Sequence, residues 1–336
     1  MDFLFLAIFY ALFCGLLFSC YLMKDSTFAT RGSVGYLRTA ITQCVTFKQL
    51  LPVTVRDAAY YVEDQVFFTR NCYFQVIYLV LMLIGHFIVF AEALPFLYKS
   101  QPDVNHTFIP IALLTVNMIF FAVSSWSDPG LIDKDNHERY AKTYAYDDVM
   151  YKTHNNCRTC QFAKPARSKH CSIYNRCISK FDHYCLWVNN AVGGLNHRYF
   201  LAFLLSVLAV TVDGVLLITK ALLQVIDTYN MWNLYYLDSM NKPHPVTIRV
   251  LAQSLFLQFP RLVILNAALV MTAVTMAGFF SYHVWLTVTN QTTNERYKRE
   301  QLSCSTNPYT RGLLANIGED LFLKPPSVTT RTKKRR

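Results

Sequence analysis

The segment that decides the fold of this chain reads Cys157-x2-Cys160-x9-His170-Cys171-x5-Cys177-x4-Asp182-His183-Tyr184-Cys185. It contains half of the ten cysteines of the 336-residue chain. Zinc prefers four Cys or His ligands in a tetrahedron, and a Cys-x2-Cys pair supplies two of them from one tight turn. The available partners for Cys157 and Cys160 are His170, Cys171 and Cys177. The spacing therefore predicts a structural zinc site.

The same segment ends in a candidate nucleophile, Cys185, which Asp182 and His183 precede. A cysteine thiol with a pKa of about 8.5 is only a few per cent thiolate at neutral pH. A histidine that is oriented by an acid can take the thiol proton, as in other Cys-His-acid arrangements. We therefore interpret Cys185 as an activated thiol, His183 as its base and Asp182 as the group that orients His183.

Long apolar runs indicate a membrane protein. Hydrophobic residues make up 53% of the chain, and its mean hydropathy is +0.22. A helix of about 20 apolar residues crosses a hydrocarbon core of about 30 Å. Such runs predict five spans, at Phe3–Met23, Tyr73–Ala91, Thr107–Trp126, Tyr199–Thr219 and Leu262–Tyr282. The first run could instead be a cleaved signal peptide, but it is long for one and Met1-Asp2 supplies no basic start.

Lysine and arginine are concentrated in three of the segments outside these spans. Segment 24–72 carries six, segment 127–198 carries eleven, and the segment from 287 onward carries ten. The alternating loops carry one (92–106) and four (220–261). Because basic loops stay on the cytosolic side of a membrane, we expect the N-terminus in the lumen and the three basic segments in the cytosol.

The predicted fold is an all-α polytopic membrane protein of about five transmembrane helices, with a small cytosolic zinc-binding cysteine-rich domain between spans three and four. Its expected parts are 1–126 (spans one to three, with the cytosolic loop 24–72), 127–198 (the cysteine-rich catalytic domain, core 157–200), 199–286 (spans four and five) and 287–336 (a cytosolic C-terminal segment). Cysteines that face the reducing cytosol favour metal binding or catalysis over disulfides. The net charge of +11 follows from basic cytosolic loops beside anionic lipid, so we expect a membrane partner and no nucleic acid.

Further short elements accompany the cysteine array. They are Asp128-Pro129-Gly130, Cys185-Leu186-Trp187-Val188-Asn189-Asn190, Gly193-Gly194-Leu195-Asn196, Thr292-Thr293-Asn294-Glu295, and Asn307-Pro308-Tyr309 followed by Gly312 and Asn316. Together with the array they resemble the DHHC-type protein S-acyltransferases (palmitoyltransferases), whose DPG, TTxE and C-terminal aromatic-Asn elements occur in this order relative to the spans. The resemblance covers most of the chain, and Asn290–Glu295 with the N-terminal span points to one subgroup of the family.

The resemblance implies an enzyme that transfers fatty acyl groups between thiols. Cys185 would attack the thioester of an acyl-CoA such as palmitoyl-CoA, hold the acyl group, and pass it to cysteines of membrane-associated substrate proteins. The first histidine of the motif, His183, would be the base. Spans two to five would enclose the acyl chain at the cytosolic face of the membrane.

The resemblance also implies two zinc ions in the family's domain, of which this chain keeps the ligands for one. The first ligand set corresponds to Cys157, Cys160, His170 and Cys177. The second set would need Cys171 together with ligands at three positions that here hold Tyr174, Tyr184 and Ala191. We therefore predict one structural zinc ion and a second site that is repacked around the two tyrosines.

Several supporting roles follow from the resemblance. Thr293 would donate a hydrogen bond to Asp182, and Asn316 would brace the domain against the spans. The candidate residues for binding CoA are Lys164, Arg167, Lys169 and Trp187. For the three basic residues, ordinary surface charge is an equally good explanation.

Two readings from other functional classes remain open. A catalytically silent relative would act as a membrane adaptor that binds acyl-CoA or client proteins; the missing second zinc motivates this reading, and the intact Asp182, His183 and Cys185 argue against it. A membrane-anchored zinc-finger module, such as a ubiquitin-ligase domain, would lack a second complete metal site and leave the Asp-His pair without a role.

The chain ends Lys333-Lys334-Arg335-Arg336. Lysines at the fourth and third positions from a cytosolic C-terminus resemble the dilysine signal that returns membrane proteins from the Golgi to the endoplasmic reticulum. We therefore predict residence in the endoplasmic reticulum, with the Golgi as an alternative. A basic tail that contacts anionic lipid is the competing explanation of these residues.

Overall fold

The structure is a computed structural model that describes residues 52–100, 103–237, 240–302 and 307–322. The predicted first span, most of the loop 24–72 and the basic end of the chain lie outside the described residues. The described chain divides into two units. One unit comprises 76–119 and 204–279, and the other comprises 52–75, 120–203 and 280–322.

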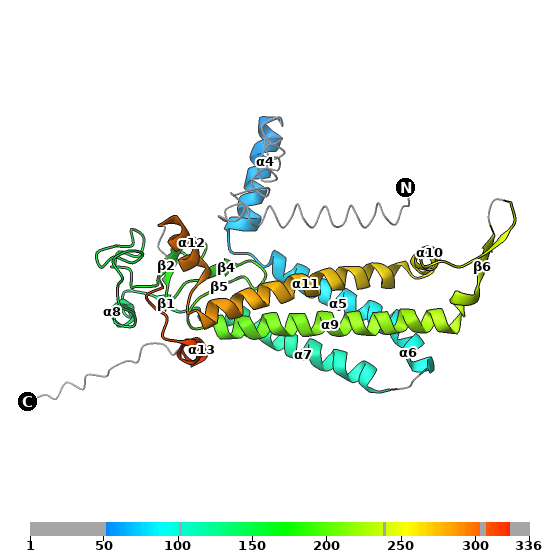
Figure 1. Cartoon of the computed structure of the whole chain (residues 1–336). Helices are drawn as coiled ribbons and strands as arrows, with labels where there is room; N and C mark the ends of the chain where they lie inside the picture. The colour runs from blue at the N-terminus through cyan, green and yellow to red at the C-terminus, as the bar shows by residue number, and fades with distance from the viewer. Residues whose placement is uncertain (1–51, 101–102, 238–239, 303–306, 323–336) are drawn as a thin grey trace, which may run out of the picture. The chain divides into compact units, whose positions relative to one another are not determined.

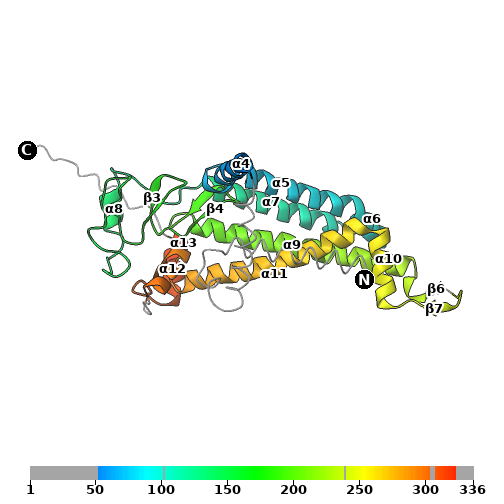
Figure 2. The same ribbon diagram turned by 90° about the horizontal axis from the view of Figure 1, so that it is seen from above.

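Within the described residues, four helical segments are long and apolar enough to cross a membrane. They are α5 (Tyr73–Ile88), continued by a π-helical stretch (Val89–Ala93) and α6 (Leu94–Ser100), then α7 (Asn105–Trp126), α9 (His197–Thr228) and α11 (Pro260–Val288). Figures 1 and 2 show α5, α7, α9 and α11 running side by side. The four predicted spans that fall on described residues are therefore confirmed, and α9 and α11 extend beyond their predicted ends.

The first unit is held together by apolar contacts and by one buried polar group. Ala93, Ile218 and Leu262, from three different helical segments, are each fully buried in one cluster. Asn117 of α7 is also fully buried, and its side chain accepts a hydrogen bond from Tyr78 (2.5 Å) and donates one to Ser206 (3.0 Å). A satisfied amide of this kind links helices where no water can replace the partner.

Between α9 and α11 the first unit contains more structure than the sequence indicated. A 3-10 turn (Met231–Asn233) leads to the antiparallel strands β6 (Tyr235–Leu237) and β7 (Pro243–Pro245), and then to α10 (Ile248–Gln258). The hydroxyl of Thr247 caps α10 by accepting from the amide of Val250. The segment that we expected to be a plain loop thus carries a hairpin and a helix.

The second unit contains the cysteine-rich segment, which forms short strands. Strands β1 (Leu131–Ile132), β3 (Arg176–Ile178) and β2 (Lys169–Cys171) make an antiparallel sheet in that order, and β4 (His183–Cys185) pairs with β5 (Asn190–Val192). Helices α4 (Val53–Glu63), followed by a π-helical stretch (Asp64–Phe68), and α8 (His137–Ala141) complete this part. Gly193 follows β5, where a Cβ would lie only 2.7 Å from the side chain of Ile178. The hairpin can therefore lie against β3 only with glycine there.

Two C-terminal helices belong to the same unit: α12 (Thr293–Gln301) and α13 (Leu313–Phe322). Helix α12 begins with a capping box, in which Thr292 accepts from the amide of Glu295 and the Glu295 carboxylate accepts from the amide of Thr292. Glu295 is buried, so its carboxylate needs a positive partner as well.

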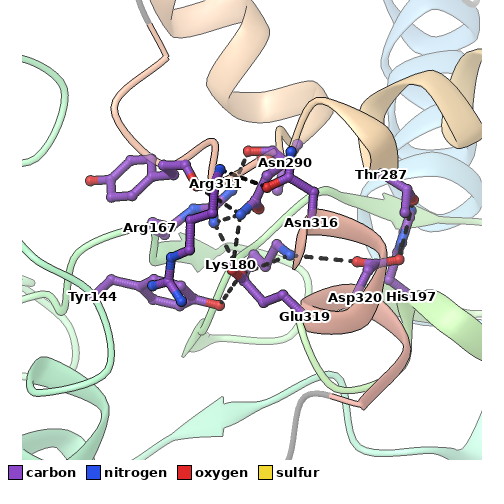
Figure 3. Close-up of polar contacts among 12 residues, drawn as sticks. Tyr144, Arg167, Lys180, His197, Thr287, Asn290, Arg311, Asn316, Glu319 and Asp320 are labelled. Atoms are coloured by element: carbon purple, nitrogen blue, oxygen red, sulfur yellow. Dashed lines mark hydrogen bonds and ion pairs between the residues drawn. The ribbon is translucent and has the colours of Figure 1, made fainter. Parts of the chain in front are cut away.

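That partner is Arg167, which is fully buried. Its Nε and Nη2 atoms donate to the two carboxylate oxygens of Glu295 at 2.7 and 2.8 Å. The rings of Tyr144 and Tyr309 lie 4.9 and 4.5 Å from the guanidinium carbon. Figure 3 shows Arg167 between Tyr144 and Asn290, and its Nη1 atom donates to Oδ1 of Asn290 at 2.9 Å. The interactions join the cysteine-rich segment to α12 and to the C-terminal segment.

Helix α13 is joined to the same unit by two acidic residues (Figure 3). The ammonium of Lys180 lies 3.2 Å from Glu319 and 3.5 Å from Asp320. Asp320 also contacts the ring Nδ1 of His197 at 2.7 Å and accepts from the hydroxyl of Thr287 at 3.2 Å. These buried ionic contacts hold α13 to the cysteine-rich segment, in addition to the apolar clusters that the unit contains.

We expect Glu295→Gln to lower the free energy of unfolding by about 3–5 kcal/mol, because Arg167 would stay buried without its main counter-charge. The matched control is Glu300→Gln on the same helix, where the carboxylate pairs with Arg296 at 3.4 Å on a partly exposed surface. That change should cost less than about 1 kcal/mol. Chemical denaturation of the purified protein in detergent measures both values, and equal losses would contradict the central role of Arg167.

Candidate functional site

The predicted zinc ligands lie together in the second unit. The pairing of β2 with β3 places His170 directly opposite Cys177. The Cys-x2-Cys turn is closed by the amide of Cys160, which donates to the sulfur of Cys157 at 3.4 Å. The ligand atoms of Cys157, Cys160, His170 and Cys177 all lie within 4.8 Å of one another.

The spacing of these atoms fits a zinc ion. The Nδ1 atom of His170 lies 3.5 Å from the sulfur of Cys157, 3.4 Å from that of Cys160 and 4.0 Å from that of Cys177. Bonds of about 2.3 Å to sulfur and about 2.0–2.1 Å to nitrogen put tetrahedral ligand atoms about 3.6 Å apart. The donor set and its geometry therefore suit a structural zinc site.

The residues at the positions of the family's second zinc do not fit a metal. Cys171 and Ala191 are buried in an apolar cluster with Ile178 and Phe181, against which Tyr174 and Tyr184 pack. A single thiol among aliphatic and aromatic side chains offers no tetrahedron. The hydroxyl of Tyr184 instead donates to the side chain of Asn189 at 2.7 Å.

Strand β4 carries the candidate base and nucleophile. The Nδ1 atom of His183 lies 2.6 Å from the Oδ2 atom of Asp182, and the amide of Asp182 donates to Val192 on the paired strand at 2.9 Å. Cys185 is partly exposed at the end of the same strand. The arrangement leaves Nε2 of the imidazole to face the thiol, with which His183 shares a hydrogen bond.

Two residues of the C-terminal segment have the supporting roles that the resemblance implied: Thr293 contacts Asp182, and Asn316 anchors α13. The amide and hydroxyl of Thr293, at the start of α12, both donate to the carboxylate of Asp182. This is the contact that the resemblance predicted. Asn316 of α13 is buried, and its side chain donates to the carbonyl of Val288, the last residue of α11, at 2.8 Å. Asn316 thus ties α13 to the end of a membrane helix.

Sequence reasoning missed two buried histidines beside the catalytic pair. The ring of His283, from α11, lies 5.8 Å from that of His183, and its Nδ1 atom is 3.3 Å from Nε2 of His197. Ligand atoms of Asp182, His183 and His283 come within 4.8 Å of one another. Within this group the Nδ1 atom of His183 and the Oδ2 atom of Asp182 are hydrogen-bonded to each other at 2.6 Å. No sequence pattern distinguishes these two histidines from ordinary helix residues.

The candidate CoA-binding residues separate into two groups. Lys164 and Lys169 line a cavity of about 360 Å³ together with Lys152 and Lys298. Arg167 does not: it is fully buried and bound to Glu295, so the prediction that it binds CoA phosphates is wrong. The reason is that the buried carboxylate of Glu295 occupies the guanidinium on both of its facing nitrogens.

Trp187 follows Cys185 in the loop between β4 and β5, and it is not among the residues that line the cavity. It is 37% exposed and packs edge-on against Phe74, with ring centroids 5.3 Å apart. Its contact is therefore with the start of α5.

Comparison with known proteins identifies the family. A family model described as DHHC palmitoyltransferase matches residues 150–300. Palmitoyltransferase ZDHHC4 of Bos taurus is 35% identical over 78% of this chain and 77% of its own length, and that of Mus musculus is 34% identical over 77% and 76%. Palmitoyltransferase SWF1 of Yarrowia lipolytica is 47% identical over 29% of this chain and 25% of its own length.

The chain belongs to the DHHC palmitoyltransferase family. The subgroup to which Asn290–Glu295 pointed, DHHC-type palmitoyltransferase four, is confirmed by these matches. Within the family motif, this member has Tyr184 as its third residue. The structure shows that the pair of Asp182 and His183 is intact beside this tyrosine.

The electrostatics of the motif favour a protonated histidine. Burial would lower the pKa of His183, but its hydrogen bonds with Asp182 and Cys185 outweigh burial and raise the pKa to about 10. Burial would raise the pKa of Asp182, but the hydrogen bond and the charge of His183 hold that pKa well below its usual range. His183 is therefore a strong proton acceptor whose charged form Asp182 stabilises.

This shift predicts a pH dependence of stability. A histidine whose pKa rises from about 6.5 when unfolded to about 10 when folded stabilises the fold fully below pH 6.5, and this contribution disappears as the pH rises through 10. We expect Asp182→Asn to remove it. The difference in melting temperature between the wild-type chain and Asp182→Asn should thus be largest near pH 6 and shrink towards pH 10. A difference that stays constant over this range would show that Asp182 does not raise the pKa of His183.

Proposed function

We propose that this chain is a protein S-acyltransferase that moves a fatty acyl group from acyl-CoA, through Cys185, to cysteines of substrate proteins. The observation that carries the proposal is the hydrogen bond between Asp182 and His183, at the start of the strand that ends in Cys185. The apolar helices supply the membrane setting that the substrate needs, and the named activity of the relatives is the same.

The first step charges the enzyme. Because its pKa is raised, His183 already holds the proton of the Cys185 thiol at neutral pH, and Asp182 stabilises this imidazolium. The thiolate attacks the carbonyl carbon of the acyl-CoA thioester, the bond from that carbon to the CoA sulfur breaks, and the proton on His183 passes to the leaving CoA thiolate. The acyl group is then bound to Cys185 as a thioester.

The second step repeats the chemistry with a different thiol. A cysteine of the substrate protein gives its proton to His183 and attacks the acyl group on Cys185. The thioester to Cys185 breaks, and Cys185 recovers a proton from His183. Both steps exchange one thioester for another, so no oxidant, reductant or water is consumed.

The length of the acyl chain explains why this chemistry belongs in a membrane protein. Each buried CH₂ contributes about 0.8 kcal/mol, so a 16-carbon chain in water would cost on the order of 12 kcal/mol. Cys185 precedes α9, which begins at His197, so the thiol can lie at the surface of the bilayer. We propose that the spans shelter the chain while Cys185 reacts.

One zinc ion would complete the domain through Cys157, Cys160, His170 and Cys177. The strands around these residues are only two or three residues long. Such short strands need an additional cross-link to be stable. A structural zinc ion contributes directly to folding energy. It takes no part in the transfer steps above.

A cavity of about 360 Å³ in the same unit is suited to the phosphates of CoA. Lys152, Lys164, Lys169 and Lys298 line it, and the ammonium of Lys298 lies 4.2 Å from the ring centroid of Tyr151. Burial and the nearby charge of Lys169 lower the pKa of Lys298. An anion between these ammonium groups would relieve their repulsion, which is why we propose this cavity and not the sealed site of Arg167.

The proposed membrane orientation and subcellular localisation of the protein are inferred from the sequence. We propose a cytosolic active site because the basic segments flank the cysteine-rich domain, and endoplasmic reticulum membranes because of Lys333 and Lys334. The proposed partners are the membrane, acyl-CoA and membrane-associated proteins with cytosolic cysteines. The proposed cytosolic domains are 127–198 and 287–336.

We expect Cys185→Ala to abolish labelling of the purified protein by palmitoyl-CoA, and His183→Ala to slow it at least about 100-fold because a general base is lost. Both variants should keep one zinc ion per chain, since neither residue is a ligand. Cys157→Ala is the contrasting control and should lose zinc and fold poorly. Unchanged labelling in Cys185→Ala would favour the silent adaptor, and two zinc ions per chain would disprove the single-site assignment.

The lysine cavity gives a separate expectation. Lys164→Ala combined with Lys169→Ala should raise the KM for palmitoyl-CoA about tenfold or more, because each charge-assisted contact with phosphate is worth about 1.5–3 kcal/mol. The turnover number should change little, since these contacts are the same before and during transfer. Lys134→Ala, at an exposed position of the same domain, is the control. A KM that stays at the wild-type value would make the lysines ordinary surface charges.

A further inference from the structure

The hairpin that presents Cys185 lacks the metal that the family's second ligand set would hold, and the structure shows another support for it. Strands β4 and β5 are three residues each, and the loop between them runs from 186 to 189. A hairpin this short is not stable by itself. Something else must fix the loop that follows the thiol.

Three side chains form a continuous hydrogen-bonded clamp on that loop. The hydroxyl of Tyr184 donates to Oδ1 of Asn189 at 2.7 Å. The Nδ2 atom of Asn189 donates to Oε1 of Gln75 at 3.2 Å, and Nε2 of Gln75 donates to the carbonyl of Val188 at 3.2 Å. Each amide thus uses both its oxygen and its nitrogen, so the clamp runs from β4 across the loop to the start of α5.

The geometry of the loop explains why asparagine and not glutamine stands at position 189. The backbone of Asn189 has φ of +49°, a left-handed conformation that asparagine tolerates better than most residues. Its neighbour Val188 is fully buried, which keeps the carbonyl that Gln75 contacts in place. One residue therefore satisfies the turn and carries the middle of the clamp.

The segment before α5 is itself well anchored. The side-chain amide of Asn71 donates to the carbonyls of Gln65 and Val66 at 2.7 and 2.9 Å. Arg70 lies over the ring of Tyr174, 4.8 Å from its centroid, and Phe74 packs against Trp187. Both tyrosines that replace zinc ligands are thus contacted directly or through Asn189 by residues 70–75.

We propose that the clamp of Tyr184, Asn189 and Gln75 replaces the second zinc ion in positioning Cys185. The proposal rests on the proposed function in that it makes these three residues positioning residues for acyl transfer. A zinc ion would hold the hairpin only within its own domain, whereas the clamp holds it to the first turn of a membrane helix. Burial raises the pKa of Tyr184 to about 12, so its hydroxyl remains a donor throughout the physiological range.

The test compares Tyr184→Phe and Gln75→Ala with Tyr73→Phe, a phenol removed from an exposed position two residues before Gln75. Deuterium exchange of the amides of residues 183–192 should be about 3–10-fold faster in the first two variants, because each loses hydrogen bonds of ordinary strength. Their self-acylation at saturating palmitoyl-CoA should fall by a similar factor, with zinc content unchanged. Tyr73→Phe should match the wild type, and wild-type exchange in both clamp variants would overturn the proposal.

A second experiment tests whether the clamp substitutes for a metal ion or only contributes to general packing of the hairpin. The triple change Tyr174→Cys, Tyr184→His and Ala191→Cys restores the second ligand set, and uptake of a second zinc ion shows that it has formed. In that chain, Gln75→Ala should alter exchange of the hairpin less than twofold, because the metal now holds it. An undiminished effect would count against replacement of the metal. If the triple variant does not fold, the first comparison decides, and exchange reports on the clamp even if the wild-type chain transfers no acyl group.

Discussion

The buried ion pair between Arg167 and Glu295 is the interaction on which the second unit depends. Both groups are removed from water, and each would lose its main counter-charge without the other. Arg167 also has a left-handed backbone, with φ of +62°, a conformation that persists in a bulky residue only when its surroundings impose it. The same Glu295 closes the capping box at the start of α12, whose first residue, Thr293, holds the carboxylate of Asp182. A single pair thus connects the architecture of the cysteine-rich domain to the position of Asp182, which orients His183.

The active hairpin is a weak element that several stronger ones support. Asp182 is fixed by Thr293 and by the pairing of β4 with β5, and Gly193 permits the close approach to Ile178 that seats the hairpin on the sheet. The cluster of Cys157, Cys160, His170 and Cys177 lies beside the neighbouring strands, and in our proposal the start of α5 supports the loop after Cys185. This division leaves the Cys185 thiol partly exposed while the side chain of His183 is held by Asp182. The loss of one metal site is then compatible with an intact catalytic motif.

Much of this was predictable from local pattern. Apolar runs of membrane length predicted the four described helices because length and hydropathy alone decide whether a helix can cross a bilayer. The spacing of Cys157, Cys160, His170 and Cys177 predicted a cluster because zinc ligation demands few and specific residues. Arg167 was misassigned because a basic residue in a loop gives no sign of whether it faces solvent or a carboxylate 128 positions along the chain. His197 and His283 escaped notice for the same reason.

The sequence by itself determined the membrane helices, because long apolar runs are decided by composition alone. It also determined the candidate metal ligands and the order of Asp182, His183 and Cys185, because these residues are close in the chain. Only the tertiary structure decided which charges are buried, that Glu295 and Asp320 bring α12 and α13 to the cysteine-rich domain, and that Gln75 reaches the loop beside Cys185. Those contacts join segments separated by more than a hundred residues. Their geometry follows from how whole elements pack, and no local pattern of residues encodes it.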